Sequence, residues 1–300
     1  VDLRAGQDEV PSDLAALLVI GPQKQISARE LFRIDQYLMN GGAVGFFVGG
    51  VKVDLQSQAP TLAGEVLDTG VNDLFDRYGI HVNSDLVFEP RQSGRIPIRG
   101  PMGIPLLLSY PPWPTVAPLA AGHPVTFRLE QLTLPFTSSL RIEDRLRSSR
   151  QARLTVLGSS TPQSWRETSG WSLEPNRQQW ARGTDGGPFP LAAALEGTLP
   201  SAWADRPAPG EPAPPDTGPM STPDGGVPGT PEVVRQRTRS SRLLVVGGSD
   251  VATDVIQSLM SRMARSETPS ETALMVNAVA WLTQERGLIA VRAKEIEEPL

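Results

Sequence analysis

The sequence predicts an α/β domain with a mostly parallel sheet, helices on both faces, a β-rich insertion and one long disordered loop. Three observations lead to this fold class. Nearly continuous apolar runs of strand length occur at both ends of the chain, helical apolar stripes follow several of them, and proline becomes frequent in the middle. Strands that are buried on both faces of a parallel sheet have continuous apolar runs rather than alternating ones.

The first unit is a strand, a helix and a second strand. Leu14–Gly21 and Ala43–Val48 are the apolar runs, and we expect both strands to be buried on both faces. Between them, Ser27 and Glu30 have the spacing of a capping box, so a helix should begin after Ser27. The helix should present an apolar stripe to the sheet, and Asn40 and the glycines after it should end it. The stripe consists of Leu31, Ile34 and Leu38.

The middle of the chain changes character. A short helix over 71–78 and a strand over Asp85–Phe88 are predicted first. Short β segments broken by proline follow, which is typical of edge strands, and we place a β-rich insertion at about 90–150. Ala152–Gly158 has the buried-strand pattern again. A further strand is expected within 188–199, with an edge position as one option.

Residues 200–231 are rich in Pro, Gly, Ala, Ser and Thr. Such a segment buries too little apolar surface to offset its ordering entropy, so we predict a disordered loop. The predicted organisation is therefore one α/β domain formed by 1–199 and 232–300. Its last part should contain a strand, two helices and a final strand. These are expected at Arg242–Gly248, 255–263, 269–286 and Leu288–Val291. The second helix should begin with Pro269 after a capping box of Thr268 and Glu271, and should present Leu274, Ala278, Trp281 and Leu282 on one side.

Composition excludes several classes of function. The net charge of −5 provides no general attraction for nucleic acid, which we do not expect as a partner. The chain has no Cys and two His, so a Cys-ligated metal, a thiolate nucleophile and a multi-His site are excluded. No apolar run approaches the roughly 20 residues of a membrane-spanning helix. The chain begins at Val1, which suggests a processed chain or an excised domain, and any membrane segments of its parent would lie outside it.

Several phrases, in this order, resemble the GldG-like family of gliding-motility and ABC-type transporter auxiliary components. The opening LLVIGPQKQISARELFRIDQYLMNGGAVGFFV resembles that family's first strand, helix and strand, and GHPVTFRLEQLTLPFTSSL resembles its His-Pro phrase. The phrases together cover most of the chain outside the predicted loop. They lie at 17–48, 78–89, 122–140, 157–165, 188–197, 242–254 and 276–294.

The resemblance implies a fold similar to class I glutamine amidotransferase-like and flavodoxin-like domains. It also implies a periplasmic or extracytoplasmic domain that flanking transmembrane segments, absent from this chain, anchor to the inner membrane. Its partners would be the permease and ATPase subunits of an ABC transporter. We therefore expect a non-catalytic binding or coupling module, in gliding motility or a related export system. A solute-binding receptor and a carboxylate-dependent hydrolase of cell-envelope glycans are the alternatives, and the transported substrate and a homo-oligomeric state stay open.

No catalytic, cofactor-binding or metal-binding residue is assigned. An amidotransferase needs a nucleophilic Cys, and the serine elbow G-x-S-x-G does not occur; Gly158–Ser159–Ser160 lacks its second glycine. Ser249 and Asp250 follow a predicted strand, where backbone amides could attract an anion, although a helix cap is the favoured interpretation. The two histidines and the carboxylates, Asp35 among them, are expected in turns and on solvated faces.

Tryptophans in Pro- and Gly-rich segments are the other candidates. Such aromatic side chains often mark contact surfaces, and they equally often cover small cores beneath long loops. With Ser249 and Asp250 they make up the predicted interaction surface. The four tryptophans are Trp113, Trp165, Trp171 and Trp180.

Overall fold

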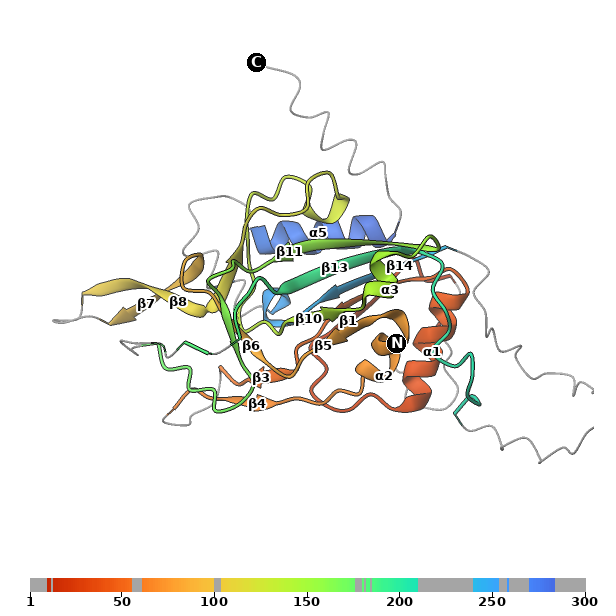
Figure 1. Ribbon diagram of the computed structural model, residues 1–300, viewed down its shortest axis with the longest axis horizontal. Helices are drawn as coiled ribbons and strands as arrows, with labels where there is room; N and C mark the ends of the chain where they lie inside the picture. The colour runs from red at the N-terminus through yellow and green to blue at the C-terminus, as the bar shows by residue number, and fades with distance from the viewer. Residues whose placement is uncertain are drawn as a thin grey trace, which may run out of the picture.

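The computed structural model describes residues 10–11, 13–55, 61–99, 104–175, 180, 182–183, 185–209, 240–253, 258 and 270–283. At its centre is a five-stranded sheet in the order β1-β2-β14-β13-β11, covered by helices on both faces (Figure 1). The predicted α/β architecture is confirmed at this level. The strands are β1 Leu17–Ile20, β2 Ala43–Phe47, β11 Ala152–Ser159, β13 Pro190–Gly197 and β14 Ser241–Val246.

The direction of the strands differs from the prediction. β1 pairs with β2 and β2 with β14 in parallel, but β13 is antiparallel to both β14 and β11. Most of the other described strand pairs are antiparallel too, so the prediction of a mostly parallel, flavodoxin-like sheet is wrong. The physical reason is that a continuous apolar run reports burial on both faces and carries no information about strand direction.

Three positions in the sheet also differ from expectation. β11, for which Ala152–Gly158 has the buried-strand pattern, is an edge strand that is buried at only three of its eight residues. β1 is an edge strand with partly exposed side chains, and it is shorter than the Leu14–Gly21 run. β13, for which an edge was one option, lies between β14 and β11 and is buried over most of its length. β2 and β14 are buried at every residue, as their sequences predict.

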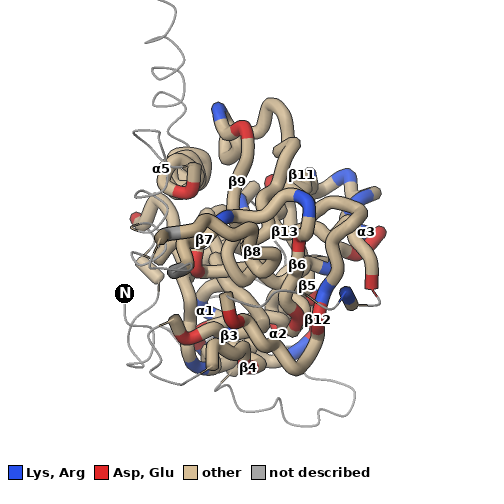
Figure 2. Tube along the Cα trace, turned by 90° about the vertical axis from the view of Figure 1, so that its left-hand side faces the viewer, with Lys and Arg blue, Asp and Glu red and all other residues tan. Residues whose placement is uncertain are grey.

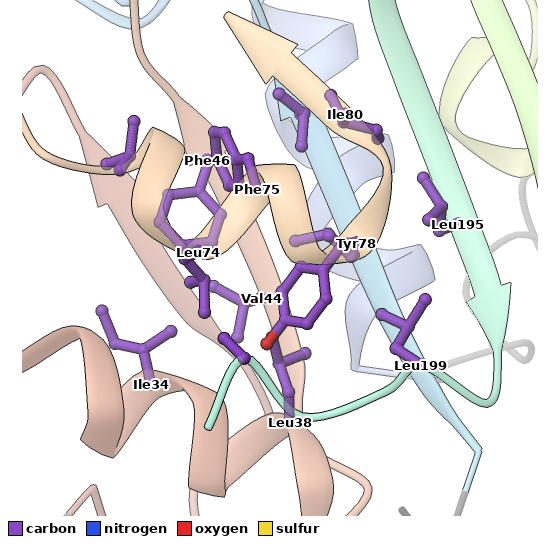
Figure 3. Close-up of a cluster of buried hydrophobic side chains, with 14 of the residues drawn as sticks. Ile34, Leu38, Val44, Phe46, Leu74, Phe75, Tyr78, Ile80, Leu195 and Leu199 are labelled. Atoms are coloured by element: carbon purple, nitrogen blue, oxygen red, sulfur yellow. The ribbon is translucent and has the colours of Figure 1, made fainter. Parts of the chain in front are cut away.

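One face of the sheet is covered by α1 (Ala28–Met39) and α2 (Asn72–Tyr78). The predicted capping box of α1 is confirmed: the Ser27 amide donates to Glu30 Oε2 at 2.8 Å, and the Glu30 amide donates to Ser27 Oγ at 3.3 Å. Figure 3 shows side chains of both helices meeting those of β2 in one core. The rings of Phe46 and Phe75 pack edge to face there, with centroids 4.8 Å apart.

The other face is covered by α5 (Ser270–Leu282), whose predicted stripe is buried against β2 and β14. The stripe consists of Leu274, Ala278, Trp281 and Leu282. Glu271 accepts a hydrogen bond from the Thr133 amide at 3.3 Å, and Thr268 of the expected capping box lies outside the described residues. The expected helix over 255–263 falls in a stretch of which the structure describes residue 258 alone, and the strand Leu288–Val291 lies outside the described residues.

The β-rich insertion at about 90–150 contains a three-stranded sheet, from which β7 and β8 project (Figure 1). Its later part returns to the body, because β10 pairs with β5 beside α2. The other elements are short except β7 and β8, which have 7 and 12 residues. They are β3 Val51–Val53, β4 Gly64–Val66, β5 Ile80–Val82, β6 Leu86–Phe88, β7 Ser93–Arg99, β8 Pro105–Val116, η2 Pro124–Thr126, β9 Leu132–Thr133, β10 Leu140–Ile142, α3 Asp144–Arg147, β12 Trp165–Glu167 and η3 Asp250–Ala252.

The segment predicted as a disordered loop, 200–231, begins with an ordered turn. Ser201, Ala202 and Trp203 are buried, and the Trp203 ring packs edge to face on Phe32 at 5.3 Å. The prediction is wrong for 200–209, because one large aromatic and a buried hydrogen-bond partner hold that turn; 210–231 lie outside the described residues. None of the helices formed by described residues is long and apolar enough to cross a bilayer.

Candidate functional site

The candidate site lies at the carboxyl ends of the three parallel strands, because α/β sheets bind ligands at that edge. A glycine follows each of these strands closely. Gly21 follows β1 with φ 52°, Gly49 and Gly50 come after β2, and Gly247 and Gly248 follow β14. Side chains are therefore absent where a ligand or another segment could approach the backbone.

The chain's own segment 137–139 occupies this edge. The Ser138 amide donates to the Gly247 carbonyl at 2.7 Å, and Ser138 Oγ accepts from the Gly50 amide at 3.0 Å. A Cβ on Gly247 would lie 2.1 Å from the Ser138 carbonyl oxygen, so the close approach requires glycine at that position. The ends of β2 and β14 are thus bonded to protein and not left open to solvent.

Asp85 holds the same segment from the other side. Its Oδ1 accepts from the Ser139 amide at 2.7 Å and its Oδ2 from Ser139 Oγ at 2.6 Å, while Arg166 Nη1 lies 3.4 Å away. Burial raises the pKa of Asp85, and the hydrogen bonds from Ser139 and the charge of Arg166 oppose that rise. A carboxylate with its oxygens engaged in this way acts as a clamp on the segment.

Ser249 and Asp250 lie beside this edge, where β14 leads into η3. Ser249 occupies the N-cap position of η3 but makes no side-chain cap hydrogen bond, so the favoured cap interpretation is wrong for Ser249. A Cβ on Gly21 would lie 3.1 Å from Ser249 Oγ, so the segments that follow β1 and β14 approach each other across the end of β2. Burial raises the pKa of Asp250 to about 7, so this carboxyl group holds a proton more readily than an ordinary aspartate.

The four tryptophans do not form an exposed surface. Trp113, Trp165 and Trp171 are 3–5 % exposed and belong to a satellite core, against which Trp180 packs partly buried. The other members of this satellite core are Val51, Leu86, Phe88, Ile96, Tyr110, Phe136 and Leu173. Trp165 stacks on Phe88 with centroids 5.5 Å apart, and Trp171 Nε1 donates to the Glu167 carbonyl at 2.8 Å. The structure matches the alternative interpretation in that the tryptophans cover a small core, but Trp113 and Trp165 lie in strands β8 and β12 and not in loops.

Asp35 is the buried group that sequence reasoning missed. It is 0 % exposed and accepts hydrogen bonds from the Tyr78 hydroxyl at 2.8 Å, Ser201 Oγ at 2.7 Å and the Ala202 amide at 2.8 Å. Burial raises its pKa. Figure 3 shows the Tyr78 hydroxyl oxygen on the side of α1. Asp35 lies four residues after Leu31 and three before Leu38, so helical spacing already placed it on the buried stripe.

The two histidines lie in separate structural contacts. His81 Nδ1 lies 2.7 Å from Asp76 Oδ1 at the end of α2. His123 Nδ1 accepts from the Val125 amide at 3.2 Å, and burial lowers the pKa of His123 to about 4, which keeps the ring neutral. Within the described ranges, no group of three His, Cys, Asp or Glu side chains could hold a metal ion.

Comparison with known proteins gives one family match. A family model described as an ABC-type uncharacterized transport system matches residues 3–278. Among solved structures, the mmIFT52 N-terminal domain is 18% identical with a TM-score of 0.35; the match covers 53% of this chain and 63% of that one, less than two thirds of its length. None of the curated proteins compared with the chain matches it.

Proposed function

This chain belongs to the family described as an ABC-type uncharacterized transport system, and on that premise we propose that it is a non-catalytic binding or coupling module of a transporter complex. Membership indicates an auxiliary protein of ABC-type transport. The narrower parts of the proposal are an extracytoplasmic position, anchorage to the inner membrane, and contact with a permease and an ATPase. We also include in the proposal a relationship to GldG-like gliding-motility components and to amidotransferase-like folds. The parallel pairing of β1 with β2 and of β2 with β14 supports this relationship.

The observation that carries the non-catalytic role is the closed carboxyl edge of the sheet. Related α/β folds place nucleophiles and ligands there. In this chain Ser138 and Ser139 use their hydroxyl groups to bind Gly50 and Asp85, within hydrogen-bond networks that fasten the segment to the sheet. A serine nucleophile needs an adjacent general base and room for substrate. Neither histidine hydrogen-bonds to these serines, which supports a scaffold role for the edge.

The hydrolase alternative needs two carboxylates that converge on one substrate. Three buried carboxylates of this chain instead take part in separate hydrogen-bond networks. Asp35 binds Tyr78 and Ser201, Asp85 binds Ser139, and Glu89 accepts from the amides of Arg91 and Thr161. Each network joins segments distant in sequence, so stabilisation of the fold accounts for these acids.

Co-purification tests the coupling role. Full-length protein, extracted under mild solubilisation, should recover the permease and ATPase of the same transport system, and its addition should change the rate of ATP hydrolysis by the assembled complex. The domain alone should hydrolyse no ATP. Repeated recovery without either partner, with an unchanged ATPase rate, would contradict the proposal.

Asp250 is the observation that favours the receptor alternative, because a partly buried carboxyl with a raised pKa near a strand end could bind a polar solute. A solute at about 100 times its Kd should stabilise the domain by about 2.7 kcal/mol. Thermal unfolding with sugars, amino acids and short peptides measures this. A stabilisation that Asp250→Asn abolishes would support a receptor instead of a coupling module.

A further inference from the structure

The β7–β8 hairpin extends beyond the body of the molecule as an arm (Figure 1). Its strands pair from Arg95 opposite Ser109 to Arg99 opposite Pro105, and the base of the hairpin joins the satellite core through Tyr110. We call residues 93–99 and 104–110 the arm. Figure 2 views the molecule with the arm toward the viewer. A two-stranded ribbon has little stability of its own, so an exposed arm of this kind suggests a contact outside the domain.

Apolar side chains continue along the arm and become more exposed toward its tip. Along β8, Tyr110 is 2 % exposed, Leu108 is partly buried and Leu106 is 42 % exposed, all on one face of the ribbon. On the opposite face Leu107 is 58 % exposed, and Ile104 near the tip is 54 % exposed. The tip therefore exposes large apolar side chains on both faces of the ribbon, which is unusual for a soluble surface.

The arm and the segment that follows it carry ionisable side chains of one sign. Residues 90–129 contain no Asp or Glu, although the whole chain carries a net charge of −5. Arg91 and Arg95 are exposed, and among the described residues neither is in an ion pair with a carboxylate. The arm thus combines an apolar tip with arginine side chains behind it, which suits a partner that is apolar inside and anionic at its surface.

Two features favour lipid over a protein strand as that partner. Strand addition needs a continuous edge of backbone amides, and Pro97 interrupts the edge offered by β7. Docking of one ribbon face on a protein would leave the other face in water, yet Leu106 and Leu107 expose apolar groups on opposite faces. A bilayer interface surrounds an inserted tip on all sides and covers both faces at once.

We propose that the arm inserts its tip into the interface of an anionic membrane, with Ile104, Leu106 and Leu107 in the apolar layer and Arg95 at the phosphate groups. Arg95 pairs with Ser109, two residues behind Leu107, which corresponds to about 7 Å along an antiparallel strand. Apolar faces of interfacial segments enter the boundary by about 5–10 Å. The arginine would therefore lie at headgroup depth when the leucines are inserted.

The absence of Cys allows a site-specific test. Leu107→Cys carries a single environment-sensitive fluorophore in the otherwise native chain, and Val279→Cys carries it on α5, where the native side chain is 41 % exposed. With vesicles of phosphatidylcholine and phosphatidylglycerol, the label at 107 should shift to the blue and brighten, and the label at 279 should not. An unchanged signal at 107, or equal changes at both positions, would overturn the proposal.

Flotation of the unlabelled chain with the same vesicles measures binding directly. Replacing Ile104, Leu106 and Leu107 together by Ser should lower the partition coefficient by more than roughly tenfold, whereas Val276→Ser with Val279→Ser should leave it unchanged. Arg95→Gln should lower it about fivefold, and only when phosphatidylglycerol is present. Unfolding curves that match the native one establish that the variants are folded. Binding that survives the triple substitution would contradict insertion through the tip.

Discussion

The carboxyl edge of the central sheet and the β7–β8 arm differ in which side chains they bury. The edge buries polar side chains, and the arm exposes apolar ones. At the edge, Asp85 and Ser138 are buried. Ser138 donates a hydrogen bond to the Asp85 carbonyl, and Ser139 donates two to the Asp85 carboxylate. On the arm, Leu106 and Leu107 extend into solvent without any covering segment among the described residues. Both features oppose the ordinary preference of polar groups for water and of apolar groups for the interior.

The difference indicates what each region contributes. A buried carboxylate is tolerated only when donors replace the water it has lost, so the edge must be a rigid part of the fold. An exposed leucine adds little to the stability of the free chain and becomes useful when another surface covers it. Substitutions at the edge should therefore change stability, and substitutions on the arm should change binding.

Asp85→Ala should have the largest effect. It leaves the Ser139 amide and hydroxyl without their acceptor and leaves Arg166 without its buried partner, so we expect a loss of about 4 kcal/mol in the free energy of unfolding. Asp73→Ala, at an exposed site in the first turn of α2, is the control and should cost less than about 1 kcal/mol. Denaturant unfolding measures both. Equal losses would mean that Asp85 is no clamp.

Gly247→Ala should come next, with a loss of about 3 kcal/mol. The added methyl would lie 2.1 Å from the Ser138 carbonyl oxygen, and backbone cannot move aside as a flexible side chain does. Gly186→Ala is a matched control, because a Cβ there meets nothing within 4 Å. That control should be neutral or stabilising by up to about 1 kcal/mol. A folded Gly247→Ala protein with native stability would show that segment 137–139 is not fastened to β14.

Asp250, beside the carboxyl edge, should make the free energy of unfolding depend on pH. The pKa of Asp250 is about 7 in the folded state and 3.8 for an ordinary aspartate, so the folded state binds the proton more tightly. The folded state therefore loses stability as the pH rises from the lower to the higher of these two pKa values. Asp250→Asn cannot ionise. It should therefore gain at least about 2 kcal/mol over the native chain between pH 4 and pH 8, since each pKa unit corresponds to about 1.4 kcal/mol. Parallel stability profiles of the two proteins would contradict burial of an ionisable Asp250.

The sequence predicts the local elements of the body well, because their signals are local. The capping box of Ser27 and Glu30, the buried strands β2 and β14 and the stripe of α5 were all expected and all found. Strand direction was not predictable from the same patterns. β13 has an apolar run like that of β14, and only the path of the intervening chain makes it antiparallel.

The candidate site was predicted less well than the fold. Ser138, Ser139 and Asp85 are distant in sequence and meet through tertiary pairing, so no local spacing signals their contact. Asp35 is different, because its helical spacing from Leu31 and Leu38 does indicate a place on the buried stripe of α1. The tryptophans illustrate a third case. Their Pro- and Gly-rich surroundings predict loops, but Trp113 lies in β8 and Trp165 in β12, and composition does not distinguish a contact surface from a satellite core.

The smallest stability effect is expected on the arm. Leu106→Ser together with Leu107→Ser removes apolar groups that are already 42 % and 58 % exposed, so the free energy of unfolding should change by less than about 0.5 kcal/mol. Tyr110→Phe, at the buried base of the same hairpin, is the contrasting variant: it deletes a hydroxyl that donates to the Leu173 carbonyl and should cost about 1 kcal/mol. Urea unfolding measures the loss in the free energy of unfolding for both variants. A loss above about 2 kcal/mol for the leucine pair would mean that the tip is packed within the folded chain, and the arm would then belong to the core it is contrasted with.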